Sequence, residues 1–204
     1  MMNNNDFLIA VLTLPGSFDG EADSLCALLE AGVERLHLRK PELPLSKLEE
    51  LVARLAPRWA SKLVLHYQPE LAVRYGIPQV HGPVKTGEGM GLKVSTSVHD
   101  WGEFAALPEG LEYAFISPVF DSISKRGYMA NVELLALPAN GLPCRPVGLG
   151  GVGAETIGEM VRRGWTGAAV LGWIWEEPGK AVERFVQLKK TIDGATEGVG
   201  SGRI

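Results

Sequence analysis

The sequence has few cysteines, only Cys26 and Cys144 among 204 residues. Two cysteines at this separation do not form a zinc motif. Cys26 lies in an apolar helical pattern (LCALL), where a reduced thiol packs as a small hydrophobic side chain. We therefore expect reduced thiols and a reducing compartment, the cytoplasm.

Long apolar runs and an excess of positive charge are also missing. No segment approaches the ~20 apolar residues that a helix needs to cross a bilayer. The first residues, MMNNND, lack the basic and then apolar segments of a signal peptide. The formal net charge of −4 disfavours nucleic-acid binding, which needs a basic surface. We expect neither a membrane nor a nucleic-acid partner, whereas local basic sites for a phosphorylated small molecule stay open.

The sequence alternates short apolar runs, typical of buried strands, with stretches of helical periodicity. The expected strands are residues 7–14, 33–39, 62–66, 78–81, 92–96, 112–117, 145–149 and 167–171. The expected helices are residues 17–32, 45–58, 69–75, 99–107, 131–137, 154–163 and 177–192. This pattern predicts an α/β protein with one domain, a (β/α)8 TIM barrel over residues 1–193, and a flexible glycine-rich tail at 194–204. A doubly wound open sheet is the alternative, but eight strands and the lack of Gly-x-Gly-x-x-Gly after the first favour the barrel.

Histidines stand at or near the ends of several expected strands, where barrel chemistry takes place. His37 and Arg39 end the second strand, His66 the third and His81 the fourth, and His99 follows the fifth. We interpret His81 and His99 as hydrogen-bonded residues beside turns. His37 is the best functional candidate, because alternation places it on the same strand face as Arg39. Imidazole can transfer protons or bind a metal, but the acidic ligands of a hard cation are missing from this set.

A polar loop follows the sixth expected strand. Ser122, Ser124 and Lys125 offer hydroxyl groups and a cation within a few residues. Such groups at the end of a buried strand favour an anion-binding edge, with an ordinary surface loop as the alternative.

Glycine turns follow the seventh and eighth expected strands. Gly150 and Gly151 come after the seventh, and Gly172, Trp173 and Ile174 come after the eighth. Glycine allows a ligand to approach the backbone closely, and barrels commonly bind a phosphate at these two loops. We therefore predict a phosphate site here rather than plain turns.

Five motifs in chain order resemble the thiamine phosphate synthases and their thiazole tautomerase relatives. They are His-Leu-Arg at 37–39, Ser-x-His at 97–99, Ser-Pro-Val-Phe-x-Ser-x-Ser-Lys at 117–125, Gly-Leu-Gly-Gly-Val at 148–152 and Gly-Ala-Ala-Val-Leu-Gly-Trp-Ile at 167–174. The resemblance implies a (β/α)8 barrel and an enzyme of thiamine biosynthesis. Synthases of this family join hydroxymethylpyrimidine pyrophosphate to a thiazole phosphate with Mg²⁺ and release pyrophosphate.

The resemblance also implies roles by position. The backbone of Gly151, Gly172, Trp173 and Ile174 would hold the thiazole phosphate. Arg39, Ser97 and Lys125 would hold the pyrophosphate. Ser122 and Ser124 stand where the family has threonines that contact the ligand.

The sequence departs from the family at the positions where the family binds pyrophosphate and magnesium. His37 replaces a glutamine and Pro41 a lysine, with Lys40 beside it. His66 and Tyr67 stand where the family has Asn-Asp, and the second magnesium aspartate, after the fourth strand, is missing too. Mg²⁺ is expected from the family, but its ligands are not evident.

Three functions stay open. They are a synthase, a thiazole phosphate isomerase with His37 or His66 as the base, and a non-catalytic binder of thiazole phosphate or thiamine phosphate. The pattern specifies no oligomeric state.

Overall fold

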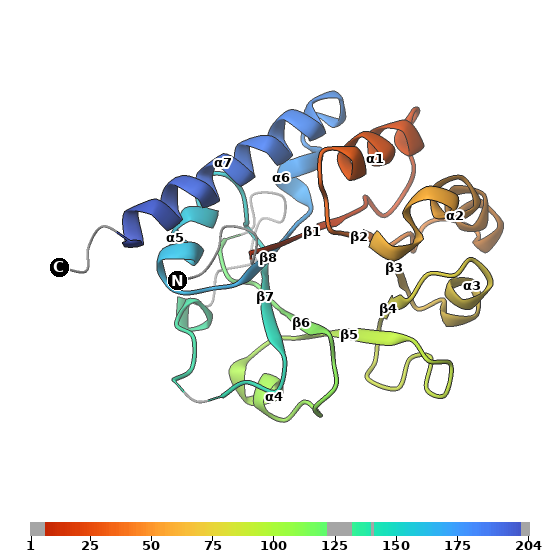
Figure 1. Ribbon diagram of the computed structural model, residues 1–204. Helices are drawn as coiled ribbons and strands as arrows, with labels where there is room; N and C mark the ends of the chain where they lie inside the picture. The colour runs from red at the N-terminus through yellow and green to blue at the C-terminus, as the bar shows by residue number, and fades with distance from the viewer. Residues whose placement is uncertain (1–6, 122–131, 140, 201–204) are drawn as a thin grey trace.

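Eight parallel strands form a closed barrel in chain order, as the sequence predicts (Figure 1). The computed structural model describes residues 7–121, 132–139 and 141–200. The strands are β1 (Leu8–Leu12), β2 (Arg35–Leu38), β3 (Leu63–His66), β4 (Gln79–His81), β5 (Lys93–Val98), β6 (Tyr113–Ile116), β7 (Arg145–Leu149) and β8 (Gly167–Val170). β1 pairs with both β2 and β8, which closes the ring.

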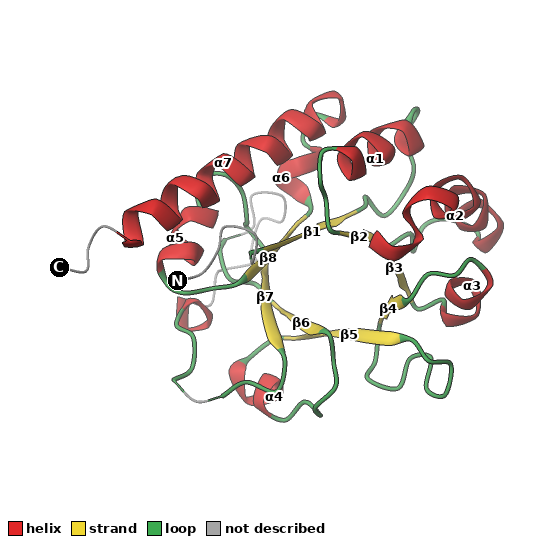
Figure 2. Cartoon of the chain, viewed as in Figure 1, coloured by secondary structure: helices red, strands yellow, loops and turns green. Residues whose placement is uncertain are grey.

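Helices surround the ring of strands (Figure 2). The α-helices are α1 (Glu21–Glu30), α2 (Leu45–Trp59), α3 (Pro69–Arg74), α4 (Trp101–Ala105), α5 (Ile157–Arg162), α6 (Gly172–Trp175) and α7 (Ala181–Gly200). Short 3-10 helices are η2 (Ala60–Lys62), η3 (Val132–Leu135) and η4 (Pro178–Lys180). Each long helix turns an apolar face to the strands, as α2 does with buried Leu48, Val52 and Leu55.

α7 runs on to Gly200, past the expected helix end at Ile192. It packs along α5, where Gly158 has no side chain and lies close to Thr191 and Ala195 of α7. This close approach supports the helix beyond Ile192. The division of the chain into a barrel and a tail at residue 194 stays a prediction.

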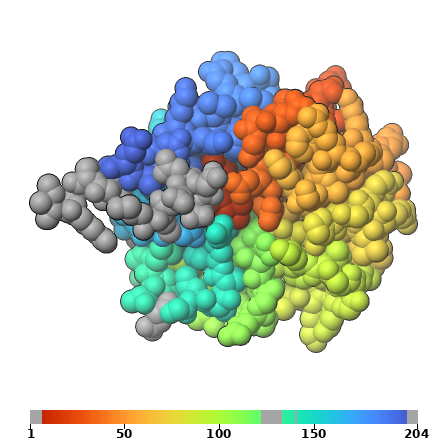
Figure 3. Space-filling view, in the orientation of Figure 1, coloured from red at the N-terminus to blue at the C-terminus, as the bar shows by residue number. Residues whose placement is uncertain are grey.

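The first and last parts of the barrel meet beside α1. α7 contacts α1 as well as α5, and its Phe185 and Leu188 are buried. The space-filling view shows the blue C-terminal part against the red and orange N-terminal part, with yellow and green segments completing the ring (Figure 3). One domain therefore contains all the described elements.

The interior of the barrel has an apolar side and a polar side. Side chains alternate along each strand, so every second residue faces inward. Leu8, Ala10, Leu12, Tyr113, Phe115, Val147 and Ala169 form an interior cluster from β1, β6, β7 and β8. The neighbouring strands β2 to β5 instead contribute the buried polar residues His37, His66, Gln79, His81 and Ser95. This polar side contains the candidate site.

Candidate functional site

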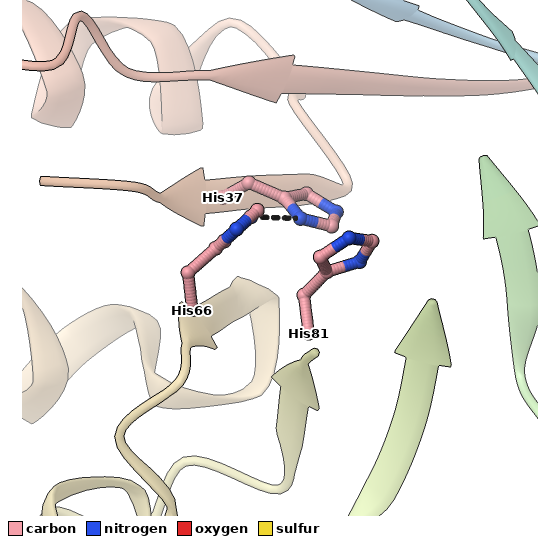
Figure 4. Close-up of side chains that lie close together, drawn as sticks. All are labelled: His37, His66 and His81. Carbon is pink, nitrogen blue, oxygen red and sulfur yellow. Dashed lines mark hydrogen bonds between the residues drawn. The ribbon is translucent and has the colours of Figure 1, made fainter. Parts of the chain in front are cut away.

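Three histidines converge inside the barrel from adjacent strands (Figure 4). His66 and His81 end β3 and β4 and are paired directly across them. His37 of β2 pairs with Val64, two positions before His66, and so lies deeper. The His37 Nδ1 and His66 Nε2 atoms are 3.0 Å apart, and the ring centroids of His66 and His81 are 4.4 Å apart. All three side chains are buried.

Two serines of β5 orient the ring of His81. Ser95 Oγ lies 3.0 Å from Nδ1, and Ser97 Oγ lies 2.9 Å from Nε2. Ser95 Oγ also lies 3.3 Å from the carbonyl oxygen of Val80 and can donate its proton there. Ser95 can then accept the Nδ1–H of His81, and this tautomer has the lone pair of His81 on Nε2.

A tyrosine of β6 orients the ring of His37. The Tyr113 hydroxyl lies 2.7 Å from Nε2, on the far side of the ring from His66. Burial raises the pKa of Tyr113 well above its usual range, so its hydroxyl stays protonated. Both ring nitrogens of His37 thus have partners.

Burial keeps the three imidazoles neutral. It is the largest cause that lowers the pKa of His66 to about 2 and that of His81 to about 4, from an ordinary 6.5. It also lowers the pKa of His37 well below that value. The neighbouring histidines add to the effect at His37, and the charge of Arg39 adds to it at His66 and His81. Neutral imidazole is the form that binds metals.

A pocket of about 150 Å³ opens beside His66. The pocket has a polar lining from Arg39, Lys40, Tyr67 and Gln68 and an apolar lining from Pro41, Leu43, Leu45 and Leu48. The backbone of Arg39 is fixed by Thr13, whose Oγ1 accepts from the Arg39 N–H at 3.0 Å and donates to the Arg39 carbonyl at 3.1 Å. Arg39 and His66 therefore share one pocket, which can hold an anion beside the guanidinium.

Lys40 also lines this pocket, but its ammonium group is held by a structural ion pair. Its ammonium forms a buried ion pair with Glu21 of α1 and donates to the carbonyl oxygen of Gly16 at 2.6 Å. Burial lowers the pKa of Lys40, and Glu21 opposes that effect. Lys40 therefore does not replace the lysine that the family has one position later.

The turn after β7 requires its two glycines. Gly150 and Gly151 have φ angles of 99° and 61°, in the left-handed region. A Cβ atom on Gly151 would lie 2.4 Å from the carbonyl oxygen of Asp121. The N–H of Phe120 also donates to the carbonyl of Gly150 at 3.1 Å. Packing against the loop after β6 accounts for these glycines, and their predicted role in phosphate binding stays a prediction.

The turn after β8 lies against the turn after β7. Gly172, Trp173 and Ile174 begin α6, and the Trp173 ring packs on Gly153, where a Cβ atom would lie 2.7 Å from it. Ile174 is fully buried. The structure thus brings the two predicted phosphate turns together.

The sequence interpretation omitted part of this site and proposed residues that lie elsewhere. It treated His81 as a plain hydrogen-bonded residue and did not select Ser95 or Tyr113. The signal for His81 was present, since two successive expected strands both end in histidine. Ser97 lies on β5 beside His81, while His99 is exposed and contacts the carbonyl of Ser117. Ser122, Ser124 and Lys125 lie outside the described residues.

Residues 15–174 match the family described as thiamine monophosphate synthase. The chain belongs to this family. It is 26% identical over 200 residues to the thiamine-phosphate synthase of Rhodospirillum centenum, covering 90% of this chain and 97% of the relative. It is 27% identical over 164 residues to a putative thiamine-phosphate synthase of Geobacter sulfurreducens, covering 74% and 77%.

Solved structures from this family have the same barrel. The thiamine phosphate pyrophosphorylase of Bacteroides thetaiotaomicron superimposes with a TM-score of 0.75 and 25% identity, over 92% of this chain and 98% of that one. The Pyrococcus furiosus pyrophosphorylase has a TM-score of 0.77 at 18% identity, over 94% and 98%, which supports the fold alone.

The described residues do not fit the magnesium that the thiamine monophosphate synthase family implies. Mg²⁺ prefers carboxylate and water oxygens in octahedral geometry. In the part of the chain that the structure describes, the only group of three or more close acidic, cysteine or histidine ligands is His37, His66 and His81. This group offers nitrogen atoms alone, so we assign no step to magnesium.

None of the described helices has the length and apolar character needed to cross a membrane.

Proposed function

We propose that the protein is a transferase of the thiamine phosphate synthase type, which joins hydroxymethylpyrimidine pyrophosphate to a thiazole phosphate. The observation that carries this proposal is the family match, which spans the barrel from Pro15, after β1, to Ile174 in α6. Arg39, Ser97 and the two glycine turns follow or end parallel strands, and the C-terminal ends of parallel barrel strands share one mouth. This placement supports the proposal of sites for two anions at one end of the barrel.

In the proposed reaction the bond between the pyrimidine methylene carbon and the pyrophosphate oxygen breaks, and pyrophosphate leaves with the electron pair. The lone pair of the thiazole nitrogen then forms the new C–N bond. Arg39 stabilises the charge that grows on the leaving group, together with Lys125 and Ser97. The backbone of Gly150, Gly151 and residues 172–174 holds the thiazole phosphate.

The test measures thiamine phosphate formed from the two substrates, with Mg²⁺ and separately with Zn²⁺ in the buffer. Arg39→Ala should lower kcat/KM about 10²- to 10³-fold, as expected when a charge-stabilising donor is removed. Arg54→Ala is the matched control, because Arg54 forms an exposed ion pair with Asp23 on the outer helices. A wild-type chain that forms no thiamine phosphate under either condition rules the proposal out.

The missing carboxylates favour a second candidate, a non-catalytic binder of thiazole phosphate or thiamine phosphate. The isomerase alternative, with His37 or His66 as the base, is weaker. A general base works best with a pKa near the operating pH, and burial holds the pKa of His66 near 2. Calorimetry with thiazole phosphate separates the candidates, because tight binding without turnover of either kind identifies a binder.

A further inference from the structure

We propose that His37, His66 and His81 bind a divalent transition metal of the zinc class inside the barrel. The three imidazoles would be the protein ligands, and a water or substrate atom would take the fourth position, as in catalytic zinc sites. This inference does not depend on the proposed reaction.

The geometry is close to that of a three-histidine site. The ligand nitrogens all lie within 4.8 Å of one another. His37 Nδ1 and His66 Nε2 are 3.0 Å apart, whereas two nitrogens on a tetrahedral zinc ion are ~3.4 Å apart, given Zn–N bonds of about 2.0–2.1 Å. The upper bound of 4.8 Å on the spacing of the three ligand atoms exceeds the tetrahedral value by about 1.4 Å, so a bound ion would draw the side chains closer together.

The surrounding hydrogen bonds are compatible with tautomers that leave one lone pair on each of His37 and His81 for an ion. In the tautomer with the proton on Nδ1, His81 donates to Ser95 and has its lone pair on Nε2, where an ion would replace the contact with Ser97 Oγ at 2.9 Å. The Tyr113 hydroxyl can accept the Nε2–H of His37, which leaves the Nδ1 lone pair toward His66. Metal-binding histidines regularly donate their other N–H to such partners, which fix the tautomer and the ring orientation.

Three imidazole ligands favour one class of metal ion. Imidazole nitrogens suit Zn²⁺, Co²⁺, Ni²⁺ and Cu²⁺, whereas Mg²⁺ and Ca²⁺ require oxygen ligands. The interior of such a barrel is ordinarily filled by branched apolar residues, so three imidazoles in contact are an unusual choice for packing alone.

The histidine cluster adjoins a pocket. His66 belongs to the cluster and also lines the pocket of about 150 Å³, so an ion would approach from this side. Arg39 lines the same pocket, and its positive charge opposes a bound cation. An anion beside Arg39 would offset that repulsion, which places metal and anion next to each other.

The test uses the full chain without a polyhistidine tag, stripped with a chelator and titrated with Co²⁺ and Zn²⁺. We expect one ion per chain, the strong visible absorption of tetrahedral cobalt, and no competition from Mg²⁺. His66→Gln should weaken metal binding by at least about 100-fold. Removing a residue that only hydrogen-bonds to a metal ligand costs about 10- to 100-fold, and loss of the ligand itself should cost at least as much. The control His99→Gln alters an exposed histidine and should bind as the wild type does.

Two readouts keep the proposal testable if His66→Gln does not fold. His81→Gln is the second ligand variant. In the wild type, ¹⁵N NMR of the histidine rings should show three nitrogens shifted by Zn²⁺. Absence of stoichiometric binding, or binding that survives both ligand variants, would overturn the proposal.

Discussion

At the scale of single residues, His37 is the most deeply buried of the three clustered histidines. His37 contacts the rings of His66, His81, Tyr113 and Phe115 and is fully buried. A charged imidazole there would lose its hydration and lie beside other cationic groups. The folded state therefore requires neutral rings.

This requirement predicts loss of stability in mild acid for the metal-free protein. The folded pKa values are lowered, to about 4 for His81 and about 2 for His66, whereas the unfolded histidines keep 6.5. Below pH 6.5 the unfolded state binds more protons, so stability is complete above 6.5 and falls as the pH drops toward the folded values. Each histidine contributes at most about 1.4 kcal/mol per pH unit.

The measurement is urea denaturation between pH 7.5 and 5 with a chelator present, above the range in which ordinary carboxylates titrate. His81→Gln removes one titrating group and should flatten the slope, whereas exposed His99→Gln should leave the slope close to that of the wild type. Equal unfolding free energies at pH 7 and pH 5 would contradict neutral buried rings.

Among the elements, the turn after β7 holds two loops together. Gly151 has a φ of 61°, and a Cβ atom there would lie 2.4 Å from the Asp121 carbonyl and 2.6 Å from Phe120. Both contacts come from the loop that follows β6, and β6 is the strand that carries Tyr113. The turn therefore fixes the position of one loop at the barrel mouth.

Gly151→Ala should destabilise the protein by more than its backbone strain alone. A left-handed non-glycine residue costs roughly 1–2 kcal/mol, and the clash with backbone atoms adds to it. Gly89→Ala is the control, because Gly89 has a φ of 77° but nothing within 4 Å of the added Cβ. Chemical denaturation should show a larger loss for Gly151→Ala, and equal losses would mean that the loop moves aside freely.

The elements were largely predictable from the sequence, because period-two and helical patterns depend on neighbouring residues. β7 was predicted to the residue, Arg145–Leu149, and the other strands begin and end within a few residues of prediction. The histidine cluster was not predictable in the same way. It depends on the pairing of His66 with His81 and on the depth of His37, which the closed barrel sets.

At the scale of the whole molecule, the barrel is closed by more than the pairing of β1 with β8. The indole Nε1 of Trp175, in α6, donates to the carbonyl oxygen of Leu12 at 2.7 Å. Leu12 is the last residue of β1, where the ladder with β8 has already ended at Val11 and Val170. The bond thus joins the first and last β/α units across 163 positions of sequence.

Trp175→Phe should weaken this closure without disturbing the rest of the barrel. It keeps an aromatic ring beside Phe18 but leaves the carbonyl of Leu12 without its donor in a buried place, which costs about 1–3 kcal/mol. Trp101→Phe is the matched control, because the buried Trp101 Nε1 has no hydrogen-bond partner among the described residues. That change removes an unsatisfied donor, so it should be nearly neutral. Urea denaturation compares the two variants. If Trp101→Phe loses as much stability as Trp175→Phe, ring size and not the Leu12 bond accounts for the effect.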